Sequence, residues 1–300
     1  MASHSPLISP EAAAARLTRG DLRVVDVRWV MGVPGGGRAA YDTGHLPGAI
    51  FLDLDTDLAA ADGPGRHPLP SPATFRERLE AVGIGSDDEV VAYDDAGGTT
   101  AARLWWMLDD LGHDRASVLD GGLSAWVAAG FPVTSEPPPT RPRGTLRLHE
   151  TWTKVIDRAG VAARLGSIVL LDARAEPRYR GEVEPIDRVP GHIPTARNIP
   201  ASDGLGADGR LLDPETLADR LRETGAGVDD VDTTVVTSCG SGVTACFTSL
   251  TMRLAGLPDP ILYPGSYSDW TQTGMPIATG LDPGEFRPQD LQLRDSRHGP

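Results

Sequence analysis

One of the chain's two cysteines, Cys239, follows a β-branched apolar run and opens a glycine-punctuated turn within TVVTSCGSGVTACFTSL, residues 234–250. Glycines at 240 and 242 permit backbone angles that let successive N–H groups point inward at one centre, an arrangement that binds anions. The helix expected after the turn adds the partial positive charge of its N-terminus. Both effects favour a thiolate over a thiol, so we predict that Cys239 is a nucleophile.

The second cysteine, Cys246, lies about two helical turns further along the chain. We expect it to be a core residue, and the alternative is a resolving thiol for an oxidised Cys239. Two cysteines at this spacing fit neither a disulfide framework nor a zinc site, which needs about four ligands. We expect no metal ion and no organic cofactor.

The chain carries an internal duplication, because four blocks of sequence recur in the same order in its two halves. The pairs are VVDVRW with LLDARA, YDTGHLPGAI with VPGHIPTARNI, SPATFRERLEAVGI with DPETLADRLRETGA, and LDGGLSAWVAAGFPV with LYPGSYSDWTQTGMPI. In this alignment Asp94 of the first copy takes the position of Cys239. We therefore expect one working site, in the second copy, and a catalytically inactive first copy.

A proline-rich stretch separates the two copies. We predict four regions, which are a first domain over 1–134, a linker over 135–150, a catalytic domain over 151–281 and a polar tail over 282–300. Within each copy, short β-branched runs alternate with helical segments, and helix starts are predicted at Ser71-Pro72 and Asp213-Pro214. This pattern predicts two tandem α/β domains, each a central parallel sheet covered by helices on both faces.

The 300 residues carry a formal net charge of −14. We expect no binding to nucleic acid or to an anionic membrane, because both need a cationic face. The first residues lack a basic region followed by an apolar core, and no window approaches about 18 uninterrupted apolar residues, so we expect a cytoplasmic protein. An anionic substrate would need a local basic pocket.

The tandem units, the motifs GHLPGA and GHIPTA, and the CGSGVTA loop of the second copy resemble the two-domain rhodanese superfamily over nearly the whole chain. The loop looks like that of the 3-mercaptopyruvate sulfurtransferase type, whereas the thiosulfate type typically has basic residues directly after the cysteine. The resemblance implies that Cys239 takes sulfur from 3-mercaptopyruvate as a persulfide, releases pyruvate and passes the sulfur to an acceptor. The acceptor would be thioredoxin, a small thiol or cyanide.

The resemblance also implies roles for residues around the thiol. Main-chain N–H groups of the loop would hold the thiolate and the persulfide, and two arginines would bind the donor carboxylate. The residues so assigned are Gly240, Gly242, Val243 and Thr244 in the loop, and Arg178 and Arg188 as the arginines.

Proton transfer is assigned by the same resemblance to Ser241 together with a histidine. His45 matches that histidine by its place in the motif. An imidazole suits the role, because its ordinary pKa lies near the working pH and Ser241 could relay a proton to it. The alternative is a turn-stabilising role for His45, because His192 fills the same position in the second copy. Only Asp42 lies close enough in sequence to His45 to be considered as its acidic partner.

Three other functions remain to be weighed. A cysteine-dependent phosphatase also holds a thiolate between a strand and a helix, but it needs an arginine six positions after the cysteine, where this chain has Ala245. A sulfurtransferase that uses thiosulfate as its donor is the main alternative. A non-catalytic rhodanese-like binding module is a more distant one, because the Cys239 loop is complete.

Overall fold

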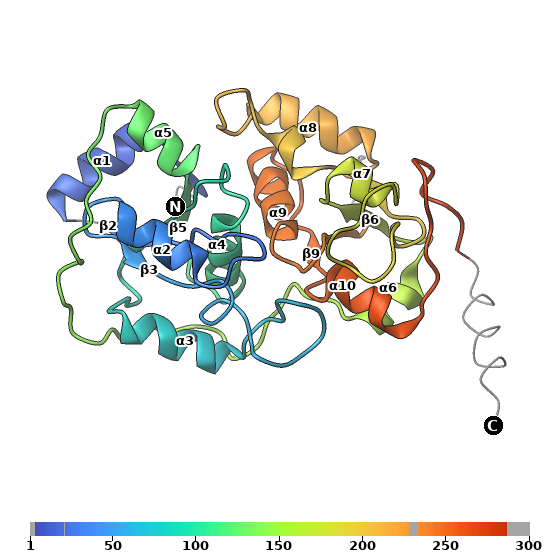
Figure 1. The fold of residues 1–300 in the computed structure, drawn as a ribbon, viewed down its shortest axis with the longest axis horizontal. Helices are drawn as coiled ribbons and strands as arrows, with labels where there is room; N and C mark the ends of the chain where they lie inside the picture. The colour runs from blue at the N-terminus through green and yellow to red at the C-terminus, as the bar shows by residue number, and fades with distance from the viewer. Residues whose placement is uncertain (1–3, 21, 228–232, 287–300) are drawn as a thin grey trace. The chain divides into compact units, whose positions relative to one another are not determined.

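The computed structural model describes residues 4–20, 22–227 and 233–286. The chain divides into two compact units (Figure 1). Unit 1 comprises Met1–Asp62, Leu69–Thr153 and Leu205–Leu212, and unit 2 comprises Gly63–Pro68, Lys154–Gly204 and Asp213–Pro300. Each unit therefore includes one short segment from the opposite half of the chain, an exchange that the duplicated sequence does not predict.

Unit 1 is built on a five-stranded sheet with the order β1-β5-β4-β2-β3, in which every neighbouring pair is parallel. The strands are β1 (Leu7–Ile8), β2 (Leu22–Asp26), β3 (Ile50–Phe51), β4 (Glu89–Tyr93) and β5 (Ala116–Leu119). The three inner strands are the β-branched runs that the sequence indicates. The two edge strands have two residues each, which is too short to show an alternating pattern.

Helices cover both faces of this sheet. Those of unit 1 are α1 (Pro10–Arg19), α2 (Gly36–Thr43), α3 (Pro72–Ala81), α4 (Ala101–Asp110) and α5 (Gly122–Ala128). One core cluster combines Ala13 of α1, Tyr41 of α2 and Trp126 of α5 with side chains of the sheet. Figure 1 shows α1 and α5 on one side of the sheet and α3 on the other.

Unit 2 repeats this plan with the strand order β7-β6-β8-β9, again parallel throughout. The strands are β6 (Val169–Asp172), β7 (Arg197–Asn198), β8 (Val235–Ser238) and β9 (Ile261–Leu262). Since β8 lies between β6 and β9, the loop that follows its carboxyl end lies over the middle of the sheet edge rather than at its side. In place of a fifth strand, Val155 forms an isolated parallel bridge with Leu262.

The helices of unit 2 also lie on both faces of its sheet. They are α6 (Arg158–Arg164), α7 (Glu176–Tyr179), α8 (Pro214–Glu223), α9 (Ala245–Leu254) and α10 (Ser266–Trp270), with 3₁₀ turns at Ala201–Gly204 and Thr271–Thr273. One core cluster joins α6, α7 and α10 to the sheet, and a second joins α8 and α9. Figure 1 shows α8 on the side opposite to α6 and α10. The predicted fold class is confirmed.

Matching details support the duplication. The predicted helix starts are present, because Ser71 accepts the N–H of Thr74 and Asp213 accepts that of Thr216. The indole N–H groups of Trp126 and Trp270 each donate to the carbonyl of the proline six residues later, both at 2.8 Å. A buried tryptophan needs such an acceptor, so the two copies share this core solution as well as their topology.

The proline-rich stretch 135–150 belongs to unit 1. The N–H of Gly144 donates to the carbonyl of Glu80 at the end of α3, and the N–H of Leu146 donates to the Glu80 carboxylate. Of the predicted tail, residues 287–300 lie outside the described part of the chain. Among the described helices, none combines the length and the apolar character needed to cross a bilayer.

Candidate active site

Cys239 is the first residue after β8 and lies six residues before the first residue of α9. The side chain is buried, and the N–H of Gly242 donates to its sulfur at 3.2 Å. The Cys239 carbonyl accepts the N–H of Tyr267 in α10. The loop therefore wraps around the sulfur at the start of a helix, as its glycines and its place in the sequence predict.

Close approach requires a glycine at position 242, and Gly240 lies directly beneath two guanidinium groups. Gly242 has φ +77°, and a Cβ there would lie 2.3 Å from the carbonyl oxygen of Pro264. A Cβ at position 240 would lie 2.7 Å from Nη2 of Arg66 and 3.6 Å from Nη1 of Arg178. Any side chain at either position would push aside the backbone or the two guanidinium groups that lie over the loop.

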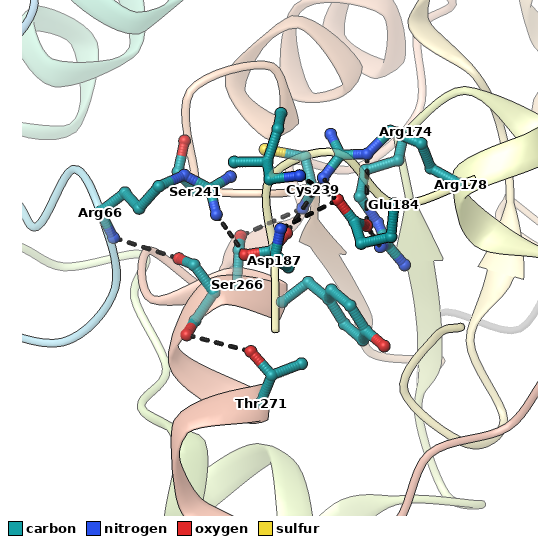
Figure 2. A network of polar contacts seen from close by, with 12 residues as sticks. Arg66, Arg174, Arg178, Glu184, Asp187, Cys239, Ser241, Ser266 and Thr271 are labelled. Atoms are coloured by element: carbon teal, nitrogen blue, oxygen red, sulfur yellow. Dashed lines mark hydrogen bonds and ion pairs between the residues drawn. The ribbon is translucent and has the colours of Figure 1, made fainter. Parts of the chain in front are cut away.

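Ser266 holds the loop from the opposite side. Its hydroxyl accepts the N–H of Cys239 at 3.0 Å and donates to the carbonyl of Tyr263 (Figure 2). The residue has φ +52°, a region that is strained for any side chain, by about 1–3 kcal/mol. Gly122 takes this position in unit 1, with φ +57°. A glycine adopts this backbone conformation without strain, whereas the serine is strained there. The serine hydroxyl, however, provides the hydrogen bond that fixes the backbone of Cys239.

The histidine beside Ser241 is His67, from the segment 63–68 that belongs to unit 2. Its Nδ1 lies 2.7 Å from the Ser241 hydroxyl, and both side chains are buried. A hydroxyl and an imidazole at this distance can exchange a proton. This pair gives the site a route for a proton two residues from the cysteine.

The prediction that His45 supplies this imidazole is wrong. His45 is fully buried in unit 1, where its ring nitrogens face the carbonyls of Tyr41 and Glu136 at 2.8 and 3.0 Å. Its ring stacks on Tyr41, as the ring of His192 stacks on Tyr179 in unit 2. The turn-stabilising alternative accounts for both histidines. Asp42 pairs with Arg38 on the surface of α2.

Two arginines meet over the loop, and a carboxylate joins them (Figure 2). Asp187 bonds to Nη1 of Arg66 through one oxygen and to Nη2 of Arg178, at 3.0 Å, through the other. Arg178 also donates to Glu184 at 2.7 Å. The predicted Arg178 is thus at the site, beside an arginine that sequence reasoning did not identify.

Arg188 is not part of this cluster. Its side chain is exposed, and among the described residues it forms no hydrogen bond or ion pair. The second arginine over the loop is Arg66, so the assignment of Arg188 is corrected. Arg174, the arginine nearest to β6, holds Asp172 and stacks on Tyr267 at 3.8 Å, and its Nη1 also lies 3.4 Å from Glu184.

Burial sets the charge balance of the cluster. It raises the pKa of Asp187, the Glu184 carboxylate adds to that effect, and Arg66 opposes it. Burial also acts against the charged form of Glu184, but the N–H of Asp187 and the guanidinium of Arg178 outweigh it and lower the pKa of Glu184. The two arginines are therefore matched by two carboxylates, one of which is held less firmly in its charged form.

In unit 1, the turn that corresponds to the Cys239 loop holds a carboxylate of the chain itself. Asp94, directly after β4, accepts four main-chain N–H groups at 2.7–2.9 Å, from Ala96, Gly98, Thr100 and Ala101. The carboxylate is buried and faces only backbone donors. The corresponding turn of unit 2 places the sulfur of Cys239 at this position, where it accepts the N–H of Gly242.

Sequence reasoning missed Arg66 and His67, because the repeat places their segment with the first half. One signal was available, since GPGRHP at 63–68 sets an arginine and a histidine among glycines and prolines shortly before α3, whereas the corresponding segment 205–212 before α8 contains no histidine. Among the described residues, no group of three or more histidine, cysteine, aspartate or glutamate side chains is placed to hold a metal ion.

A buried cysteine at the carboxyl end of a central parallel strand, with a main-chain N–H on its sulfur, is an arrangement typical of proteins that use a nucleophilic thiol. The model of the Rhodanese-like domain matches residues 9–129 and 158–273, one region in each copy. The chain belongs to the rhodanese family, which confirms the predicted membership.

Three relatives show the range of the likeness. A Pseudomonas aeruginosa protein named "Probable 3-mercaptopyruvate sulfurtransferase" is 46% identical over 287 residues, covering 93% of this chain and 99% of its own. The thiosulfate sulfurtransferase of Mus musculus is 35% identical, covering 85% and 86%. The solved structure of 3-mercaptopyruvate sulfurtransferase from Leishmania major matches with a TM-score of 0.81 at 30% identity, covering 100% and 79%.

Proposed function

We propose that this protein is a sulfurtransferase that takes sulfur from 3-mercaptopyruvate and passes it to a thiol acceptor or cyanide. The observation that carries the proposal is the meeting of three groups at one loop: the cradled sulfur of Cys239, the Ser241–His67 pair and the two arginines next to Gly240. The relatives support it, because their names include 3-mercaptopyruvate sulfurtransferases that cover most of this chain.

In the first half reaction, the thiolate of Cys239 attacks the sulfur of the donor and forms an S–S bond. The C–S bond of the donor breaks, its electron pair stays on carbon as the enolate of pyruvate, and His67 supplies a proton to that carbon through Ser241. Arg178 and Arg66 would hold the donor carboxylate, since guanidinium groups bind carboxylates through parallel hydrogen bonds.

In the second half reaction, the acceptor attacks the outer sulfur of the persulfide. With cyanide, the outer sulfur leaves as thiocyanate and the Cys239 thiolate is restored, so charge and atoms balance. The N–H groups of the loop, from Gly240 through Thr244, stabilise the sulfur anion at both stages. The persulfide anion is one atom longer than the thiolate, so it would extend toward the arginines that lie beside Gly240.

Thiosulfate is the second candidate donor, because a relative of the named thiosulfate type covers 85% of this chain. The deciding experiment measures turnover per active site with each donor, reading pyruvate or sulfite directly. Faster pyruvate release supports the proposal, and faster sulfite release replaces 3-mercaptopyruvate with thiosulfate. Mass spectrometry after incubation with the donor is expected to add about 32 Da, one sulfur atom, to the Cys239 peptide.

Replacing Arg178 tests the proposed carboxylate clamp. Arg178→Ala is expected to raise the KM for 3-mercaptopyruvate by about 100-fold, because truncating one member of a buried charge pair costs about 2–5 kcal/mol. The KM for a sulfur donor without a carboxylate should rise much less. Equal increases for both kinds of donor would contradict the clamp. Arg188→Ala is the matched control, and it should leave both KM values unchanged.

A further inference from the structure

The carboxylate of Asp187 occupies the place where the proposed donor carboxylate would bind. One of its oxygens bonds to Arg66 and the other to Arg178, so a single carboxylate spans two guanidinium groups (Figure 2). Its side chain is only 3% exposed. Both guanidinium groups lie next to Gly240, the residue that follows the cysteine. A small carboxylate ligand over Cys239 would need the same two partners.

Asp187 comes from a segment that only unit 2 possesses. In each unit a histidine ring nitrogen bonds to the carbonyl of a tyrosine, but His45 follows Tyr41 by four residues, whereas His192 follows Tyr179 by thirteen. The longer connection of unit 2 carries Glu184 and Asp187. The acidic groups of the cluster are thus an addition to the copy that contains the cysteine, and they are absent from the copy without it.

The backbone of this connection is fixed independently of the Asp187 side chain. Glu184 accepts the N–H groups of Ile186 and Asp187 at 3.1 and 3.0 Å, and it also accepts from Arg178. If the Asp187 carboxylate turned away, Arg178 would still be held by Glu184, with one donor free for another carboxylate. Opening the clamp would require the Asp187 carboxylate to rotate away from both guanidinium groups.

We propose that Asp187 fills the donor-carboxylate position of the empty enzyme and is displaced when the donor binds, which favours singly charged donors over dianions. The inference rests on the proposed function, because it takes Arg66 and Arg178 as the donor clamp. Three arginines, Arg66, Arg174 and Arg178, are balanced by three carboxylates, and the cluster therefore carries no net charge when empty; the carboxylates are those of Asp172, Glu184 and Asp187. A second negative charge on the donor therefore finds no unmatched cation there.

An internal competitor lowers the apparent affinity of a ligand by the fraction of time that the site is open. Asp187→Asn keeps the shape of the side chain and removes the charge that competes. It is expected to lower the KM for 3-mercaptopyruvate by about tenfold with kcat changed less than about twofold, and to lower the KM for thiosulfate further. Glu182→Gln is the matched control, since it removes one charge from the same connection at an exposed residue paired with Arg180.

Binding of pyruvate, which keeps the carboxylate of the donor, tests the inference without turnover. In the Cys239→Ser background, adding Asp187→Asn should tighten pyruvate binding by about tenfold in titration calorimetry, and adding Glu182→Gln should not. Asp187→Ala, which removes both oxygens, gives a second measurement of the same effect.

The outcomes are distinguishable. Weaker pyruvate binding or a raised KM in the Asp187 variants would show that this carboxylate positions the arginines for the donor, and the inference would be overturned. Absence of sulfur transfer from either donor in the unmodified enzyme would refute the proposed function, while pyruvate binding would still decide whether Asp187 competes for the clamp.

Discussion

The turns after β4 and β8 occupy the same position in the two copies and hold different side chains. In unit 1 the cradle is closed by the Asp94 carboxylate, which four N–H groups fix in place. In unit 2 the same turn surrounds the sulfur of Cys239 and receives the N–H of Gly242. A fixed carboxylate gives a stable turn, whereas a sulfur in the same cradle can gain and lose an atom. In the first copy the N–H groups of the turn stabilise the fold, and in the second copy we assign the same turn to the sulfur chemistry.

The largest expected effect comes from exchanging the thiol for a hydroxyl. Cys239→Ser should lower the rate of sulfur transfer by more than about 10³-fold, because a serine hydroxyl is a far weaker nucleophile than a thiol and cannot form a persulfide. The circular dichroism spectrum and the melting temperature should stay close to those of the unmodified protein. Cys246→Ala serves as the control and should keep its activity. Retained transfer by Cys239→Ser would remove this cysteine from the mechanism.

The two histidines offer the second contrast. His67→Gln should lower kcat by about 100-fold with little change in KM, since it removes the imidazole that faces Ser241. His45→Gln should instead lower the free energy of unfolding by about 1–3 kcal/mol and leave kcat per folded molecule unaltered. Steady-state kinetics and urea titration separate the two results. The reverse pattern would restore His45 as the partner of Ser241.

The smallest effect on turnover is expected at Asp94. In Asp94→Asn, an NH₂ group replaces one carboxylate oxygen and faces main-chain N–H groups, so donors meet donors. The substitution should therefore reduce the free energy of unfolding by about 2–4 kcal/mol. Turnover per folded molecule should be nearly unchanged, because the sulfur chemistry is assigned to unit 2. If kcat fell to the level of the Cys239 variant without loss of stability, the first copy would have a catalytic part.

Local patterns were sufficient to predict much of this molecule. The Cys239 turn is specified by glycines within three residues, and the inner strands by continuous apolar runs, so both follow from neighbouring sequence. The two-residue strands β1, β3 and β7 are held by pairing with a longer strand, and a dipeptide carries no periodicity that could indicate them.

The errors at the site arise from tertiary structure. Arg66 and His67 precede α3 in the chain but pack in unit 2, and no sequence period records that exchange. Asp187 and Arg188 are neighbours, and the turn held by Glu184 buries the first side chain and exposes the second. Sequence spacing alone cannot tell which of two adjacent residues faces inward. The expectation of a local basic pocket agrees with the structure, in which Arg66 and Arg178 lie beside Gly240.

Because segment 63–68 lies in the first repeat but belongs to unit 2, the two repeats cannot evolve independently. A gene for the second repeat alone would encode the cysteine and its cradle, yet the imidazole beside Ser241 and one of the two guanidinium groups would be left behind. The expectation of one working copy and one inactive copy is therefore incomplete, because the first repeat supplies two of the side chains beside the loop. Selection for the thiol chemistry must also preserve a hexapeptide in the first repeat, which ties the two halves together as a single hereditary unit.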